Sequence, residues 1–116
     1  MSHSSKTIST FTSVEAMDKF INDVNSEEGF TDWNLTEEEF QQLWNSHLFH
    51  ELNYELDKLI DDYEWEDIIG IEALQKAYEV TEANTISKLP IGQEFLVMLH
   101  KAIEYKTGIF FFFLQY

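Results

Sequence analysis

The spacing of apolar residues along the chain predicts an alternation of short strands and amphipathic helices. Residues 6–12 are rich in β-branched side chains and predict a short strand. Thr12 and Glu15 have the spacing of a capping box, which predicts that a helix begins there and continues until Gly29. The apolar positions on one face of this helix are Val14, Met17, Phe20, Ile21 and Val24.

The middle of the chain predicts an aromatic loop over residues 30–35, followed by a second helix. Thr36 and Glu39 form a second capping box, and the helix that they open has an apolar inner face. Its members are Phe40, Leu43 and Trp44. After a break at Asn45 and Ser46, a second helical stripe is predicted. Its members are Leu48, Leu52, Leu56, Leu59 and Ile60.

Residues 61–69 fit either a strand or a helix, and the pattern leaves both open. As a strand, they alternate in two rows, with Tyr63, Trp65 and Asp67 on one side and Asp62, Glu64 and Glu66 on the other. Residues 71–78 then predict an amphipathic helix, and Pro90 is well placed to start the next one. Gly108 is expected as the left-handed C-cap of that helix.

The last segment, residues 109–116, is predicted to be a strand with almost no polar alternation, which is typical of a strand covered on both faces. If nothing covers it, the run of phenylalanines at 110–113 becomes a dimer surface or an aggregation hazard. The fold class predicted from these elements is α+β, with four to five helices packed on a small sheet formed by the N-terminal and C-terminal strands. We expect a single domain over residues 1–116, with residues 1–5 disordered.

The charge is distributed very unevenly. Residues 20–75 contain sixteen carboxylates and one lysine, Lys58, so this segment carries the whole formal charge of −15. The remaining acids and lysines cancel, and there is no arginine. Such a surface disfavours direct binding to nucleic acid or an anionic membrane and favours a basic protein partner. No apolar run is long enough for a secretion signal or a membrane span, so we expect a cytoplasmic protein.

Few features point to catalysis. The chain has no cysteine, no Gly-x-Ser-x-Gly elbow and no glycine-rich phosphate loop, so we predict that it is not an enzyme. His47, His50 and Glu51 have a spacing compatible with a metal site, as do His100 and Glu104, but the pattern of a carboxylate-bridged di-iron bundle is missing. We therefore expect no metal and no cofactor.

The acids are interleaved with aromatic residues of the kind that anchor protein interfaces. An acidic helix start can equally serve to cap the helix, so Glu37, Glu38 and Glu39 have two interpretations of equal weight. The partner-binding residues predicted from this pattern are Trp33, Glu37, Glu38, Glu39, Asp62, Tyr63, Glu64, Trp65 and Glu66. The aromatic side chains would serve as anchors, and the carboxylates would pair with lysines and arginines of the partner.

The layout also resembles the barstar family of intracellular ribonuclease inhibitors. The similarity lies in a short first strand, a helix opening near Ser13, an aromatic segment, a second helix with Leu43 and Trp44, and a final helix, glycine and strand. The family's inhibitory helix carries Asp two positions before the Leu-Trp pair and directly after it, where this chain has Gln41 and Asn45. The resemblance implies a nuclease inhibitor whose anionic contacts come from Glu37, Glu38 and Glu39 or from residues 61–67.

Together these patterns predict a non-enzymatic inhibitor of a basic, nucleic-acid-acting protein, in first place an immunity protein for a nuclease toxin in a bacterium. One alternative is a DNA mimic that blocks restriction or CRISPR proteins. Another is an assembly subunit that oligomerises through its C-terminal aromatic strand. As an inhibitor, the chain is expected to be a monomer or a weak dimer.

Overall fold

The computed structural model describes residues 6–22, 29–61 and 65–113. Within these ranges the chain forms four strands, five α-helices and one short 3-10 helix. In chain order they are β1 (Lys6–Phe11), α1 (Val14–Ile21), β2 (Phe30–Leu35), α2 (Glu37–Asn45), α3 (Leu48–Leu56), β3 (Glu66–Ile69), α4 (Ile71–Ala83), the 3-10 helix η1 (Thr85–Lys88), α5 (Pro90–Tyr105) and β4 (Gly108–Phe112). The predicted α+β class is confirmed.

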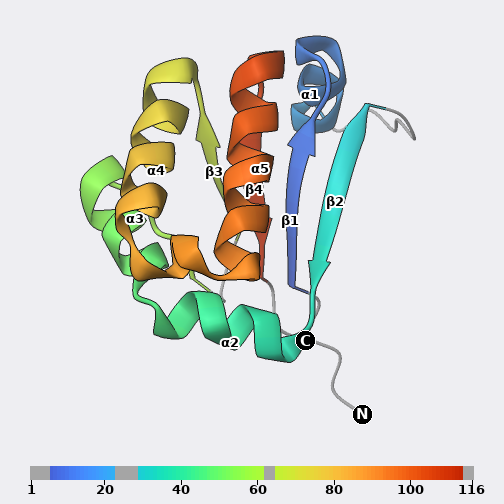
Figure 1. Cartoon of the computed structure of the whole chain (residues 1–116). Helices are drawn as coiled ribbons and strands as arrows, with labels where there is room; N and C mark the ends of the chain where they lie inside the picture. The colour runs from blue at the N-terminus through green and yellow to red at the C-terminus, as the bar shows by residue number, and fades with distance from the viewer. Residues whose placement is uncertain (1–5, 23–28, 62–64, 114–116) are drawn as a thin grey trace.

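The four strands form one antiparallel sheet in the order β2-β1-β4-β3. Its two central strands are therefore the first and the last along the chain, as the sequence predicted for the sheet. In Figure 1, α4 and α5 lie in front of the sheet and α2 crosses its lower end. The outer strands β2 and β3 form the two edges.

Alternate residues of β4 enter two separate cores. Ile109 and Phe111 belong to the main core, between the sheet and helices α2 to α5. Phe110 points to the opposite face, where it packs with Phe11 and with Ala16 of α1. The strand is thus covered on both faces, as its lack of polar alternation predicted. β1 and β3 pair with β4 on its two sides, so both edges of this strand have a neighbouring strand.

The segment predicted as an aromatic loop, residues 30–35, is strand β2, so that expectation is wrong. Six consecutive residues of β2 pair with β1, from Phe11 opposite Phe30 to Lys6 opposite Leu35. Trp33 and Leu35 turn toward the main core, whereas Phe30 lies on the other side of the strand and is 43% exposed. The alternation of buried and exposed residues along β2 is hard to recognise in the sequence, because aromatic and polar residues occur on both sides of the strand.

Three helix boundaries differ from their predictions: the start of α1, its end at Ile21, and the end of α3. Ser13, and not Thr12, caps α1 by accepting a hydrogen bond from the Ala16 N–H, because the Thr12 N–H extends the β ladder to the Gly29 carbonyl. α3 ends at Leu56, so the last two members of the predicted stripe lie beyond it. The ambiguous segment 61–69 ends in strand β3, while its residues 62–64 lie outside the described residues.

The left-handed cap of α5 is Lys106, with φ 58°, and not Gly108. Gly108 instead begins β4, where it meets β3 closely. A Cβ atom at this position would lie 2.8 Å from the Ile68 carbonyl oxygen and 2.7 Å from a side-chain carbon of Ile69. The glycine is therefore explained by close packing of two strands.

A buried lysine joins the beginning of the described chain to its end. Lys6 is only 4% exposed, and its ammonium group donates a hydrogen bond of 2.9 Å to the Phe113 carbonyl. The same group lies 4.9 Å from the centre of the Phe40 ring, a cation–π contact with α2. One of the few positive charges is therefore used inside the fold.

Candidate protein-binding surface

The first turn of α2 carries three carboxylates with different surroundings. Glu39 completes a capping box: its carboxylate accepts the Thr36 N–H at 2.9 Å, and the Thr36 hydroxyl accepts the Glu39 N–H at 3.0 Å. Glu37 and Glu38 are exposed, and Glu37 accepts only a long hydrogen bond of 3.3 Å from Gln41. The capping interpretation thus holds for Glu39, while the other two carboxylates are open to a partner.

Helix α3, the next helix along the chain, carries further exposed carboxylates and an exposed aromatic side chain. Tyr54 is 86% exposed, and it lies opposite the helix face that Leu48 and Leu52 bury in the core. Beside it is a shallow groove of about 380 Å³ between α3 and α4. Its lining residues are His50, Glu51, Tyr54, Glu55, Val80 and Ala83. Since α2 and α3 contain no lysine, we define their exposed residues Glu37, Glu38, Glu51, Tyr54 and Glu55 as the acidic helical surface.

Two carboxylates of the acidic helical surface are held in place by α4 and the residue that follows it. Glu51 accepts a hydrogen bond of 2.7 Å from the Asn84 side chain, which also donates to the Ser46 carbonyl. Glu55 lies 3.8 Å from the ammonium group of Lys76. Both contacts restrict the rotamers of these side chains before any partner binds. Less conformational entropy would then be lost on binding, so the contacts favour a preformed surface.

The lysines do little to neutralise this surface. Lys6 is buried, and Lys19 pairs with Glu15 on the same helix. Lys58 pairs with Asp67 of β3, and Lys76 pairs with Glu55 of this surface. The other three are Lys88, Lys101 and Lys106, which belong to η1, to α5 and to the cap of α5. Among the described residues, Glu55 is therefore the one carboxylate of the acidic helical surface with a lysine ion pair.

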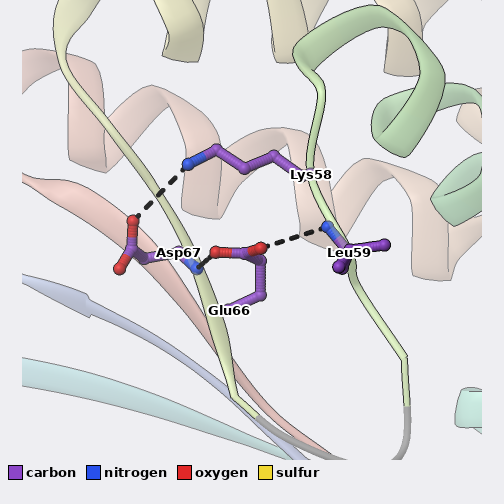
Figure 2. A network of polar contacts seen from close by, with 4 residues as sticks. All are labelled: Lys58, Leu59, Glu66 and Asp67. Carbon is purple, nitrogen blue, oxygen red and sulfur yellow. Dashed lines mark hydrogen bonds and ion pairs between the residues drawn. The ribbon is translucent and has the colours of Figure 1, made fainter.

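Glu66, predicted as a partner-binding residue, is engaged within the fold (Figure 2). One carboxylate oxygen accepts the Leu59 N–H at 3.0 Å, and the other accepts the Asp67 N–H at 2.9 Å. Lys58 reaches Asp67 from the same segment at 3.8 Å. Burial raises the pKa of Asp67, an effect that Lys58 partly opposes and the charge of Glu66 reinforces. These groups fasten residues 58–59 beside β3.

The two predicted tryptophan anchors lie on opposite faces of the sheet. Trp33 packs against the main core on the side of α2 to α5. Trp65 is 47% exposed and stacks on Phe110 and Phe112, at ring distances of 6.0 and 5.9 Å, with Phe20 of α1 at its edge. The structure therefore does not bring them together in one surface. The predicted site residues Asp62, Tyr63 and Glu64 lie outside the described residues.

Sequence analysis did not single out the α3 part of the acidic helical surface. A signal was present, because Tyr54 falls on the side of the helix opposite the leucine stripe, and tyrosine is enriched at protein interfaces. As for the histidines, the described residues contain no group of three or more His, Asp or Glu side chains placed to hold a metal ion. In the same part of the chain, no helix is long and apolar enough to cross a membrane.

The fold and the acidic helical surface together define an α+β protein with a strongly anionic exterior. No protein-family model and no curated protein matches the chain. Among solved structures, it is similar to the Neisseria DNA mimic protein DMP12, with a TM-score of 0.66 and 18% sequence identity. The match covers 96% of this chain and 100% of the other, so the two share their fold over nearly the whole length.

Proposed function

We propose that this protein is a non-enzymatic DNA mimic, which binds a basic DNA-binding protein and occupies its DNA site. The observation that carries the proposal is the acidic helical surface, where exposed carboxylates of α2 and α3 occur without a lysine on either helix. The likeness of the fold to a protein described as a DNA mimic supports it. The DNA-mimic role was one of two alternatives predicted from the sequence, and it now takes first place.

The physical mechanism is replacement of phosphates by carboxylates. Lysines and arginines that bind a DNA backbone recognise regularly placed negative charge, and a protein surface with fixed carboxylates offers the same charge. Long-range attraction would speed the encounter and make it sensitive to salt. Tyr54, exposed among the carboxylates, provides the apolar contact that charge alone does not.

Charge reversal tests this proposal. The double variant Glu37→Lys/Glu38→Lys is compared with Glu94→Lys/Glu104→Lys, which changes the net charge equally but lies on α5. Each protein is immobilised, basic proteins are captured from the host lysate, and double-stranded DNA is then added. We expect DNA to release the partner from the wild type and from the α5 variant, and the α2 variant to capture at least about ten-fold less. Equal loss in both variants would reduce the effect to net charge and refute a specific surface.

The same capture separates a general DNA-binding partner from a nuclease toxin, which stays a prediction from the sequence. A captured protein that cleaves nucleic acid, and stops doing so when this protein is added, would identify an immunity protein. A partner that binds DNA without cleaving it would identify the mimic role. Both results require a basic partner, which is the part that the two roles share.

A further inference from the structure

The two edges of the sheet differ in what lies beside them. On the outer side of β3, residues 58–59 are fastened by Glu66 and Asp67 (Figure 2). On the outer side of β2, Figure 1 places no described helix or strand. The β2 edge is therefore the open edge of the sheet among the residues that the structure describes.

The hydrogen-bond pattern identifies which backbone groups point outward from β2. Thr12 donates its N–H to the Gly29 carbonyl at 2.8 Å, and the β1–β2 register places these residues opposite each other. In an antiparallel ladder, hydrogen-bonded pairs alternate with non-bonded pairs. Thr31, Trp33 and Leu35 therefore bond to β1. The N–H and carbonyl groups of Phe30, Asp32 and Asn34 point to the open edge.

The open edge carries one charged residue, Asp32, but lacks the other usual protections against another strand. All six residues of β2 pair with β1 in an unbroken register, so no bulge twists the strand away. The strand contains no proline and no lysine, the residues that commonly block edges. Side chains do not cover it either: the Asp32 carboxylate accepts the Ser9 hydroxyl, and the Asn34 side chain accepts the Thr7 hydroxyl, so both lie toward β1.

We propose that the β2 edge binds an extended basic segment of the protein partner, which adds a fifth strand to the sheet. The inference rests on the proposed function, because that function requires a basic partner. Asp32 is exposed on this strand, and the exposed Glu37 and Glu38 follow directly on α2. Main-chain hydrogen bonds would supply affinity and the carboxylates would select lysine or arginine.

Charge also argues against a second copy of this chain as the occupant. An antiparallel pair of β2 strands related by a two-fold axis would bring together two Asp32 residues and two acidic helix starts. Each copy carries a net charge of −15, so their approach is repulsive at low salt. A basic strand would instead be attracted to the same edge by the opposite charge.

A proline variant with a matched control tests the inference. Asn34→Pro removes one outward N–H, whereas Asn34→Ala removes the same side-chain contact to Thr7 and keeps that N–H. The probe is a capped octapeptide of alternating lysine and valine, titrated while amide hydrogen exchange is followed by NMR. We expect the amides of Phe30, Asp32 and Asn34 to exchange at least about five-fold more slowly in the wild type, with Thr31 and Trp33 unchanged.

The alanine variant should keep this protection, and the proline variant should lose it. A glutamate–valine octapeptide should have no effect on any of the proteins. Equal binding by both variants, or peptide-induced changes confined to α2 and α3, would overturn the proposal. The outward amides could instead be protected without peptide, with protection that increases with protein concentration. That result would assign the edge to a second copy of the chain and would also overturn the proposal.

The same variants keep this inference distinct from the proposed function. If the captured partner is lost by Glu37→Lys/Glu38→Lys and kept by Asn34→Pro, the mimic function stands and the edge proposal fails. If both variants lose the partner while Asn34→Ala keeps it, both proposals are supported. If neither variant loses it, both fail.

Discussion

The two edges of the sheet show two ways of treating the same problem, a row of backbone groups without a neighbouring strand. We call the β3 edge closed because residues 58–59 lie beside it, held by side-chain contacts of Lys58, Glu66 and Asp67. The β2 edge is longer by two residues and is left open among the described residues. The difference teaches that acidic residues in such a chain need not all be free for binding, since Glu66 and Asp67 make contacts within the fold.

Proline at an inward position of β2 should have the largest effect on this comparison. Thr31→Pro removes an N–H that bonds to β1, so the free energy of unfolding should fall by about 3 kcal/mol or more. Asn34→Pro removes an outward N–H and should stay within about 1 kcal/mol of Asn34→Ala. Urea unfolding of the three proteins, with Thr31→Ala as the fourth, measures both differences. Equal losses for the two prolines would contradict the assigned alternation.

Opening the closed edge should have the next largest effect. Glu66→Ala leaves the N–H groups of Leu59 and Asp67 without their carboxylate, and we expect a loss of about 1–2 kcal/mol in the free energy of unfolding. Glu66→Gln keeps one acceptor oxygen and should lose roughly half as much. Amide exchange at Leu59 gives a local measurement, and unchanged exchange in Glu66→Ala would show that residues 58–59 are held by other contacts.

The smallest effect concerns the pH dependence of the closed edge. Burial raises the pKa of Asp67, so the folded chain holds this proton more tightly than the unfolded chain does. Below both pKa values the residue is neutral in both states and costs nothing. As the pH rises through the unfolded and then the folded pKa, a penalty on the folded state appears, and above the folded pKa it is constant.

Asp67→Asn cannot ionise and should escape this penalty. The free energy of unfolding of the variant minus that of the wild type should therefore increase across this window and level off above it. Urea unfolding from about pH 3 to about pH 8 measures the difference. Lys58→Gln removes the charge that partly opposes the shift, so the penalty should be larger in that background. A difference that decreases with pH would mean that Lys58 outweighs burial.

The sequence predicted most of the fold because its signals were periodic and local. The helical stripes gave α1 to α5, the second capping box was confirmed, and the apolar run before residue 114 correctly indicated a strand covered on both faces. Strand β2 escaped because its pairing with β1 is set by tertiary contact and its aromatic residues resembled a loop. The cap at Gly108 was misplaced because strand packing also selects glycine.

The candidate site was less accessible to sequence reasoning. The charge pattern does not distinguish one acidic residue from another. The backbone geometry shows that Glu39 caps α2 and that Glu66 holds residues 58–59 beside β3. Glu37 and Glu38 were predicted and are exposed. Tyr54 was missed because the prediction for α3 rested on its buried leucine stripe and did not consider its outer face. Trp33 and Trp65 were grouped by residue type, although the sheet separates them.

The pairing of β1 with β4 has a consequence for the order of events during folding. The centre of the sheet joins Thr7 to Phe112 and Thr10 to Ile109, residues about as far apart along the chain as the fold permits. A ribosome releases β1 long before β4, so β1 must wait with only β2 beside it while the helices are made. Such distant contacts slow folding, because a long loop has to close before they form. The sheet is therefore completed late, when its last strand inserts between β1 and β3.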